Sequence, residues 1–268
     1  MKAPKLQYRI LDPTGNITAL VESPVEPEKQ PRAAAEIMAL HPEVEQVGFV
    51  DFTGEVPALR MAGGEFCGNA SLCAGALLLL KRGAEYGVPE ILSLRVSGGE
   101  EPVELCMTRQ SPDRFQGSVC MPPAKEIRRQ RLAFGEARGE LTLVWMEGIS
   151  HLIVPPDSAF FPLRQRPEKA EEALRLWCGE LGAKGLGLMF LEGEPPCCAL
   201  TPLVYVPGSD TMFWEHSCAS GSSAVGMALA GAEGKDVSLS LRQSGGTLRV
   251  ESCPQGDTRL YGTVRIQG

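Results

Sequence analysis

Two short segments carry the residue types and spacing that could do chemistry. Residues 64–70 (GEFCGNA) and 215–221 (EHSCASG) each place a cysteine before small residues, and an alanine-rich apolar run follows each one. This pattern predicts a loop that turns into the N-terminus of a buried helix, with Cys67 or Cys218 at the turn. The first N–H groups of such a helix lack partners within it and carry the positive end of its dipole. They therefore favour a carboxylate ligand and lower the pKa of a nearby thiol.

Two such cysteines in one chain predict a paired acid and base. One thiolate can remove a proton from a carbon while the other thiol delivers one to its opposite face, which inverts a stereocentre without a cofactor. An amino acid's α-hydrogen is only weakly acidic, so backbone N–H groups must stabilise the charge that develops on the carboxylate. The small or short residues that would let a ligand approach those amides are Gly68, Asn69, Ala219, Ser220 and Gly221.

The alternative interpretation of Cys67 and Cys218 is a pair of buried structural cysteines, and it is favoured for either one taken alone. Glu65 and Glu215 either orient the thiols or serve only as the acidic residues that helix N-termini prefer. Cys73, six residues after Cys67, is interpreted as a core residue of the helix. The other cysteines are interpreted mainly as small hydrophobic residues.

The elements that must position these residues occur twice. Residues 15–21 (GNITALV) align with residues 148–154 (GISHLIV), and after each segment come proline, a helical pattern, a strand pattern and a cysteine motif. A repeat of about half the chain indicates a duplicated domain rather than a solenoid. We expect an α/β (α+β) protein of two pseudo-symmetric halves, with the N-terminal half at 1–125, completed by 256–268, and the C-terminal half at 126–255. Residues 125–131, which are basic, are expected to form a surface crossing between them.

Composition narrows the function classes. The net charge of −7 argues against a nucleic-acid or anionic-membrane partner, and no apolar run approaches the roughly 20 residues that span a bilayer. The N-terminus lacks the apolar core of a signal peptide, so a cytoplasmic protein is expected. Nine cysteines then indicate free thiols, and with three histidines and no CxxC spacing we expect no metal site.

At these residues the chain resembles the cofactor-independent, diaminopimelate epimerase-like amino-acid racemases and epimerases. Residues 65–70 and 217–222 look like the two cysteine motifs of that superfamily. The resemblance implies that each half is a curled, mostly antiparallel sheet around a central helix, with the active site in the cleft between the halves. It also implies a small amino-acid substrate, no cofactor and a possible homodimer. Asn16 matches a substrate-contacting asparagine of the superfamily, and His151 matches the histidine of its Gly-Asn-Pro-His segment.

Departures from the superfamily's pattern bear on the substrate. Diaminopimelate epimerases usually carry a Glu-Arg pair before the second cysteine, whereas residues 207–216 contain no arginine, and Ile149 and Ser150 alter the Gly-Asn-Pro-His segment. These changes favour a racemase of a single-centre amino acid, similar to the histidine racemases of this superfamily. Phe213 and Trp214 could form an aromatic wall for a ring-bearing side chain or belong to the core.

Other functions stay open at this point. Diaminopimelate epimerase is the alternative within the superfamily, and an isomerase of the phenazine-biosynthesis type shares the duplicated fold but typically lacks the cysteine pair. A thiol redox protein or an amino-acid-binding protein are more remote alternatives. A binding protein would not need two opposed thiols.

Overall fold

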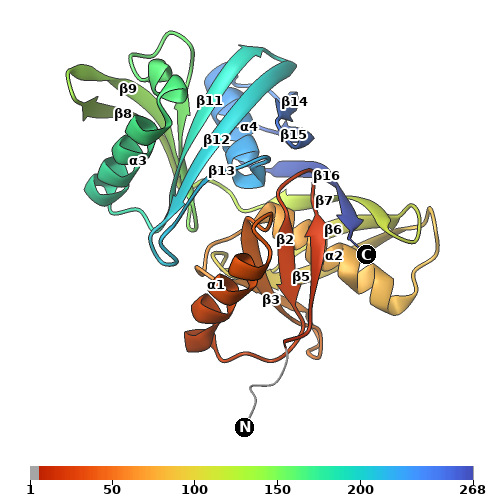
Figure 1. The fold of residues 1–268 in the computed structure, drawn as a ribbon. Coiled ribbons are helices and arrows are strands. Elements are labelled where there is room, and N and C mark those ends of the chain that lie inside the picture. Colours follow the sequence, from red (N-terminus) through yellow and green to blue (C-terminus); the bar gives the residue numbers. More distant parts are fainter. Residues whose placement is uncertain (1–5, 268) are drawn as a thin grey trace. The chain divides into compact units, whose positions relative to one another are not determined.

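The computed structural model describes residues 6–267 and divides the chain into two compact units (Figure 1). Unit 1 comprises the residues up to Val119 and from Tyr261 onward, and unit 2 comprises Cys120–Leu260. The chain thus passes from one unit to the other at 119/120 and returns at 260/261, where the sequence places the crossings at 125/126 and 255/256. Each unit has its own run of hydrogen-bonded strands and its own central helix.

Unit 1 wraps one mixed sheet around a helix. The strands follow the order β1-β2-β3-β4-β5-β6-β7, and only the β2–β3 and β4–β5 pairs are parallel. The far end of β16 pairs with β1, and its Ile266 also donates to the carbonyl of Asp113, just before β7. The strands are β1 (Tyr8–Asp12), β2 (Thr18–Val21), β3 (Gln46–Asp51), β4 (Ala58–Met61), β5 (Pro89–Val96), β6 (Val103–Arg109), β7 (Arg114–Met121) and β16 (Thr258–Ile266).

Unit 2 repeats this arrangement. Its strands follow the order β15-β14-β12-β11-β10-β9-β8, with β13 added on β12, and only β10–β11 and β12–β14 are parallel. Parallel and antiparallel pairs alternate in the same order along β9-β10-β11-β12-β14-β15 as along β1-β2-β3-β4-β5-β6. The strands are β8 (Glu126–Phe134), β9 (Ala137–Trp145), β10 (Ser150–Val154), β11 (Leu186–Glu194), β12 (Cys197–Val206), β13 (Thr211–Trp214), β14 (Val237–Gln243) and β15 (Gly246–Ser252).

A buried helix lies at the centre of each unit: α2 (Gly68–Arg82) in unit 1 and α4 (Ala219–Glu233) in unit 2. Both are apolar around most of their circumference, which suits a helix that a curled sheet surrounds. Each ends at a glycine in the left-handed region, Gly83 at φ 65° and Gly234 at φ 65°. The predicted fold class, an α/β protein built from two similar halves around central helices, is therefore confirmed.

Two outer helices cover the sheets at equivalent places in the repeat. In unit 1 a short 3-10 turn (Pro27–Lys29) leads into α1 (Gln30–Leu40), which packs on β3. In unit 2 a 3-10 segment (Phe161–Gln165) precedes α3 (Pro167–Leu181), whose buried face centres on Trp177. That ring meets Phe160 edge-on at 5.0 Å and donates its N–H to the carbonyl of Ala133. Within residues 6–267, no helix is long and apolar enough to cross a membrane.

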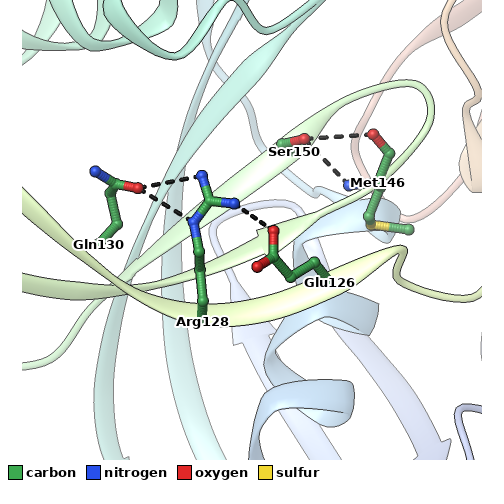
Figure 2. Close-up of polar contacts among 5 residues, drawn as sticks. All are labelled: Glu126, Arg128, Gln130, Met146 and Ser150. Atoms are coloured by element: carbon green, nitrogen blue, oxygen red, sulfur yellow. Dashed lines mark hydrogen bonds and ion pairs between the residues drawn. The ribbon is translucent and has the colours of Figure 1, made fainter.

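The expected surface crossing at 125–131 is wrong from Glu126 onward, because these residues form strand β8. Side chains two apart lie on the same face of a strand, and Figure 2 shows Arg128 between Glu126 and Gln130 on that face. Arg129 and Arg131 both pair with Glu140 of β9. The hydrogen-bonded ladder with β9 runs along the whole strand, and Leu132 and Phe134 near its end reach the core of unit 2.

Candidate active site

Cys67 is the N-cap of α2. Its backbone is extended (φ −135°, ψ 113°), and its Sγ accepts the N–H of Ala70 at 3.4 Å. On its other side the Sγ–H donates to Oε1 of Gln46 at 3.0 Å. The sulfur therefore lies where a cap side chain usually satisfies the first turn of a helix, as the sequence motif predicts.

A polar network backs this thiol and includes two of the predicted substrate residues. Asn16 is buried, and its Oδ1 accepts hydrogen bonds from Gln46 at 2.5 Å and from Asn69 at 3.2 Å. The Nδ2 of Asn16 donates to Glu45 at 2.6 Å. The structure thus brings Asn16, Asn69 and Cys67 together, and it adds Gln46 and Glu45, which the sequence analysis missed.

Glu65 lies in the loop before Cys67, and the pKa of its carboxyl group lies above the ordinary value. Burial is the main cause, while backbone hydrogen bonds at Glu65 and Gly63 and the charge of Arg60 act in the opposite direction. Its Oε2 is buried and has no hydrogen-bond partner among residues 6–267. Ser97 fixes the loop by donating to the carbonyl of Glu65 at 2.6 Å.

Cys218 occupies the same position at α4. It is the N-cap (φ −114°, ψ 108°), its side chain is buried, and its Sγ accepts the N–H of Gly221 at 3.3 Å. Its backbone N–H donates to Oε1 of Gln243 at 2.8 Å, and the amide of Gln243 donates to Ser222 at 3.1 Å. Gln243, at the end of β14, is another residue that the sequence analysis missed.

His151 approaches Cys218 through a serine. The imidazole Nε2 lies 3.0 Å from Oγ of Ser220, whose Oγ lies 3.7 Å from the Sγ of Cys218. His151 is fully buried, and this burial lowers the pKa of its imidazole to about 3, so the ring is neutral. Its Nδ1 has no hydrogen-bond partner among the described residues. Figure 2 shows the start of its strand, where Ser150 bonds to both the N–H and the carbonyl of Met146.

The pKa of the Cys218 thiol lies well above its ordinary value, so the expectation of a lowered pKa is wrong for this residue. Burial is the first cause, followed by the charge of Glu215 and its hydrogen bond, and these outweigh the N–H of Gly221 and the hydroxyl of Ser220. A helix N-terminus favours a thiolate only to the extent that solvent or a cation also supports the charge.

The remaining predicted residues fall on the first turns of the two helices. Gly68 and Ala219 are the first helical residues, and both are buried. Cys73 and Cys178 are buried as expected of core residues, whereas Cys106, Cys120 and Cys253 are only half-buried. His216 is exposed, and Trp214 stacks on Phe190 at 5.9 Å beside the unit 2 core, which favours its core interpretation. In the described part of the chain, no group of three or more His, Cys, Asp or Glu side chains could hold a metal ion.

Comparison with solved structures defines the class of the fold. It is similar to a probable proline racemase from Agrobacterium radiobacter K84 with bound carbonate, at a TM-score of 0.71 and 14% identity over 98% of this chain and 91% of that one. It is also similar to a predicted epimerase from Pseudomonas aeruginosa, at a TM-score of 0.69 and 16% identity over 98% of both chains. The fold is therefore that of the proline racemase-like epimerases.

Sequence comparison then defines the family. A histidine racemase of Fusobacterium nucleatum (strain ATCC 23726) is 29% identical over 232 residues, which cover 84% of this chain and 81% of that protein. A histidine racemase of Staphylococcus aureus (strain Mu50) is 26% identical over 227 residues, covering 83% and 79%. The family model for the histidine racemase CntK N-terminal domain matches residues 5–268, and the chain belongs to this family. It is an isomerase of the racemase and epimerase class.

Proposed function

We propose that this protein racemises histidine, with Cys67 and Cys218 as the two bases and without a cofactor. The observation that carries the proposal is that both cysteines cap the buried central helices of the two similar units, each with its Sγ on a first-turn N–H. The names of the relatives and of the family support histidine as the substrate. The absence of an arginine from residues 207–216 supports a substrate with a single stereocentre.

In the proposed reaction, the two sulfurs act on opposite faces of the α-carbon. One cysteine, as the thiolate, takes the α-proton, and the electron pair of the broken C–H bond passes into the carboxylate as an enediolate. The other cysteine, as the thiol, donates its proton to the opposite face of the carbon. The product is the other enantiomer, and the two sulfurs have exchanged protonation states, so no oxidant, reductant or metal takes part.

The helix N-termini supply the electrostatic part of this reaction. The N–H groups that open α2 and α4 are the groups available to a carboxylate, and their dipoles favour the negative charge that grows on it. Gly68 has no side chain to cover those amides, whereas the space beside Gly221 is occupied by the side chain of Met189. Asn16, Asn69 and His151 are the proposed substrate-binding residues beside them.

A cytoplasmic location and a homodimer are part of the same proposal. All nine cysteines are free thiols in the structure, which suits the reducing cytoplasm. The homodimer implied by the superfamily resemblance is part of the proposal, and sedimentation velocity of the purified protein tests it.

The deciding experiment incubates the reduced protein with each L-amino acid and with diaminopimelate in deuterated water. Mass spectrometry follows deuterium at the α-carbon, and chiral chromatography follows the D-enantiomer. Deuterated D-histidine alone is the expected result, whereas label in diaminopimelate alone would support epimerisation of that substrate instead. Cys67→Ser and Cys218→Ser should each abolish racemisation, and Cys197→Ser, at an exposed cysteine, is the matched control that should retain it. Full turnover by either active-site variant would refute the two-thiol mechanism.

A further inference from the structure

We propose that Gln46 is a positioning residue that holds Cys67 in its protonated thiol form and makes it a stronger base once deprotonated. The contact itself is the 3.0 Å hydrogen bond from the Cys67 Sγ–H to Oε1 of Gln46. An amide presents either a donor or an acceptor to a neighbour, depending on which way it is turned. The role of Gln46 therefore depends on whether its orientation is fixed.

Thr18 fixes one side of the Gln46 amide. The Thr18 hydroxyl donates its hydrogen to the carbonyl of Asn16 at 2.9 Å, so its oxygen is left to act as an acceptor. It accepts from Nε2 of Gln46 at 2.8 Å. If the Gln46 amide were flipped, its oxygen would face the Thr18 oxygen, which is also an acceptor, and this hydrogen bond would be lost.

Glu45 fixes the other side through Asn16. The carboxylate of Glu45 accepts the Nδ2 of Asn16 at 2.6 Å, so the Oδ1 of Asn16 must face the opposite way. There it accepts from Nε2 of Gln46 at 2.5 Å. Both donors of the Gln46 amide are thus committed to Thr18 and Asn16, and only its oxygen can face the sulfur.

A fixed carbonyl oxygen favours the thiol over the thiolate. The thiol donates a hydrogen bond to it, whereas a thiolate would face its lone pairs, and the N–H of Ala70 at 3.4 Å is the opposing contact. The Cys73 thiol, within α2, interacts electrostatically with Cys67, and the carboxylate of Glu45 reaches Cys67 through the hydrogen bonds of Asn16 and Gln46. The charge of Arg60, on β4, acts on Glu65.

The effect of this orientation on the reaction is inferred on the basis of the proposed function. The α-hydrogen of an amino acid is very weakly acidic, so a base of higher pKa removes it more readily. An acceptor locked onto Cys67 raises that pKa and keeps a proton on this sulfur in the resting enzyme. In the direction of the reaction in which Cys67 is the base, this higher pKa makes it a stronger one.

The test measures the thiol pKa of Cys67 by itself, in the Cys218→Ser protein, which cannot turn over substrate. The rate of iodoacetamide alkylation is followed against pH by mass spectrometry of the Cys67 peptide. Gln46→Met removes the acceptor and should lower the pKa of Cys67 by about one unit, because a hydrogen bond of this kind contributes on that order. Gln46→Glu places a negative charge there and should raise it. Gln243→Met, in unit 2, is the matched control and should leave it unchanged.

The two variants make the proposal falsifiable even if one of them folds poorly, which circular dichroism would show. No shift in either folded variant, or shifts of the same sign in both, would overturn it. In the enzyme with both cysteines, Gln46→Met should lower kcat more than it changes KM and move the pH profile. Opposite thiol shifts in a protein that racemises nothing would leave the Gln46 proposal standing and refute the proposed function.

Discussion

Lowering the pH from about 7.5 to about 5 should destabilise unit 2 through His151. In the unfolded chain this imidazole takes up a proton near its ordinary pKa of 6.5, whereas burial lowers the pKa to about 3 in the folded unit. Between those values the unfolded chain binds more protons, so the free energy of unfolding falls as the pH falls. At pH 5, proton uptake by His151 favours the unfolded chain over the folded unit by a factor of about 30. This factor corresponds to about 2 kcal/mol at 1.36 kcal/mol per pKa unit.

Tryptophan fluorescence is the suitable assay because all three tryptophans, Trp145, Trp177 and Trp214, lie in unit 2 with His151. Urea titrations at the two pH values give the free energy of unfolding of this unit. His151→Gln keeps a hydrogen-bonding group beside Ser220 but does not titrate, so its loss of stability should be smaller by about 2 kcal/mol. His216→Gln removes the other histidine of this unit, at an exposed position, and is the matched control. An equal loss with and without His151 would refute the assignment.

Three further substitutions test the packing around the helices. Gly83→Ala should cost about 1 kcal/mol and lower Tm by a few degrees, because φ is 65° there and no atom lies within 4 Å of the added carbon. Gly221→Ala places a carbon 2.1 Å from the Sδ of Met189 and 3.1 Å from the sulfur of Cys218; it should cost about 1–3 kcal/mol in urea unfolding and sharply lower racemase activity. Gly187→Gln should destabilise unit 2, because its Cβ would lie 2.6 Å from Nδ1 of His151. Adding His151→Thr should restore part of that loss, and a double-mutant cycle with no coupling would contradict this packing argument.

Local chemistry explains what could be predicted from the sequence. A small hydrogen-bonding side chain before a run of small and apolar residues is an N-cap pattern, so the places of Cys67 and Cys218 follow from neighbours within a few residues. The duplicated order of elements predicts the two central helices in the same way. Strand β8 could not be predicted, because its first six residues are mostly charged or polar and it forms through its backbone ladder with β9.

The polar partners of the cysteines could not be predicted, because they depend on tertiary register. Gln46 reaches Cys67 from 21 residues away, and Gln243 reaches the backbone of Cys218 from 25 residues away. Neither glutamine belongs to a sequence motif. Gln46 begins β3 and Gln243 ends β14, and polar residues are common at the termini of strands. The raised pKa of Cys218 likewise depends on burial, which the helix-end argument does not include.

Matching strand pairs show how the two units came to differ. Thr18 stands opposite Gln46 across β2 and β3, and in unit 2 His151 stands opposite Gly187 across β10 and β11. The repeat in the sequence aligns Thr18 with His151. One unit therefore combines a small hydroxyl with a long amide, and the other combines a large ring with a glycine.

The polar side chain of each pair determines which hydrogen-bonding group lies near the cysteine of that unit. In unit 1 it is an amide oxygen locked onto the sulfur of Cys67, and in unit 2 it is a neutral imidazole that reaches Cys218 through Ser220. In the proposed two-base reaction one proton is shared between two sulfurs, so two identical environments would leave the free enzyme divided between both arrangements of that proton. Exchanging these side chains within a duplicated fold makes the two environments unequal and leaves the order of strands and helices in place.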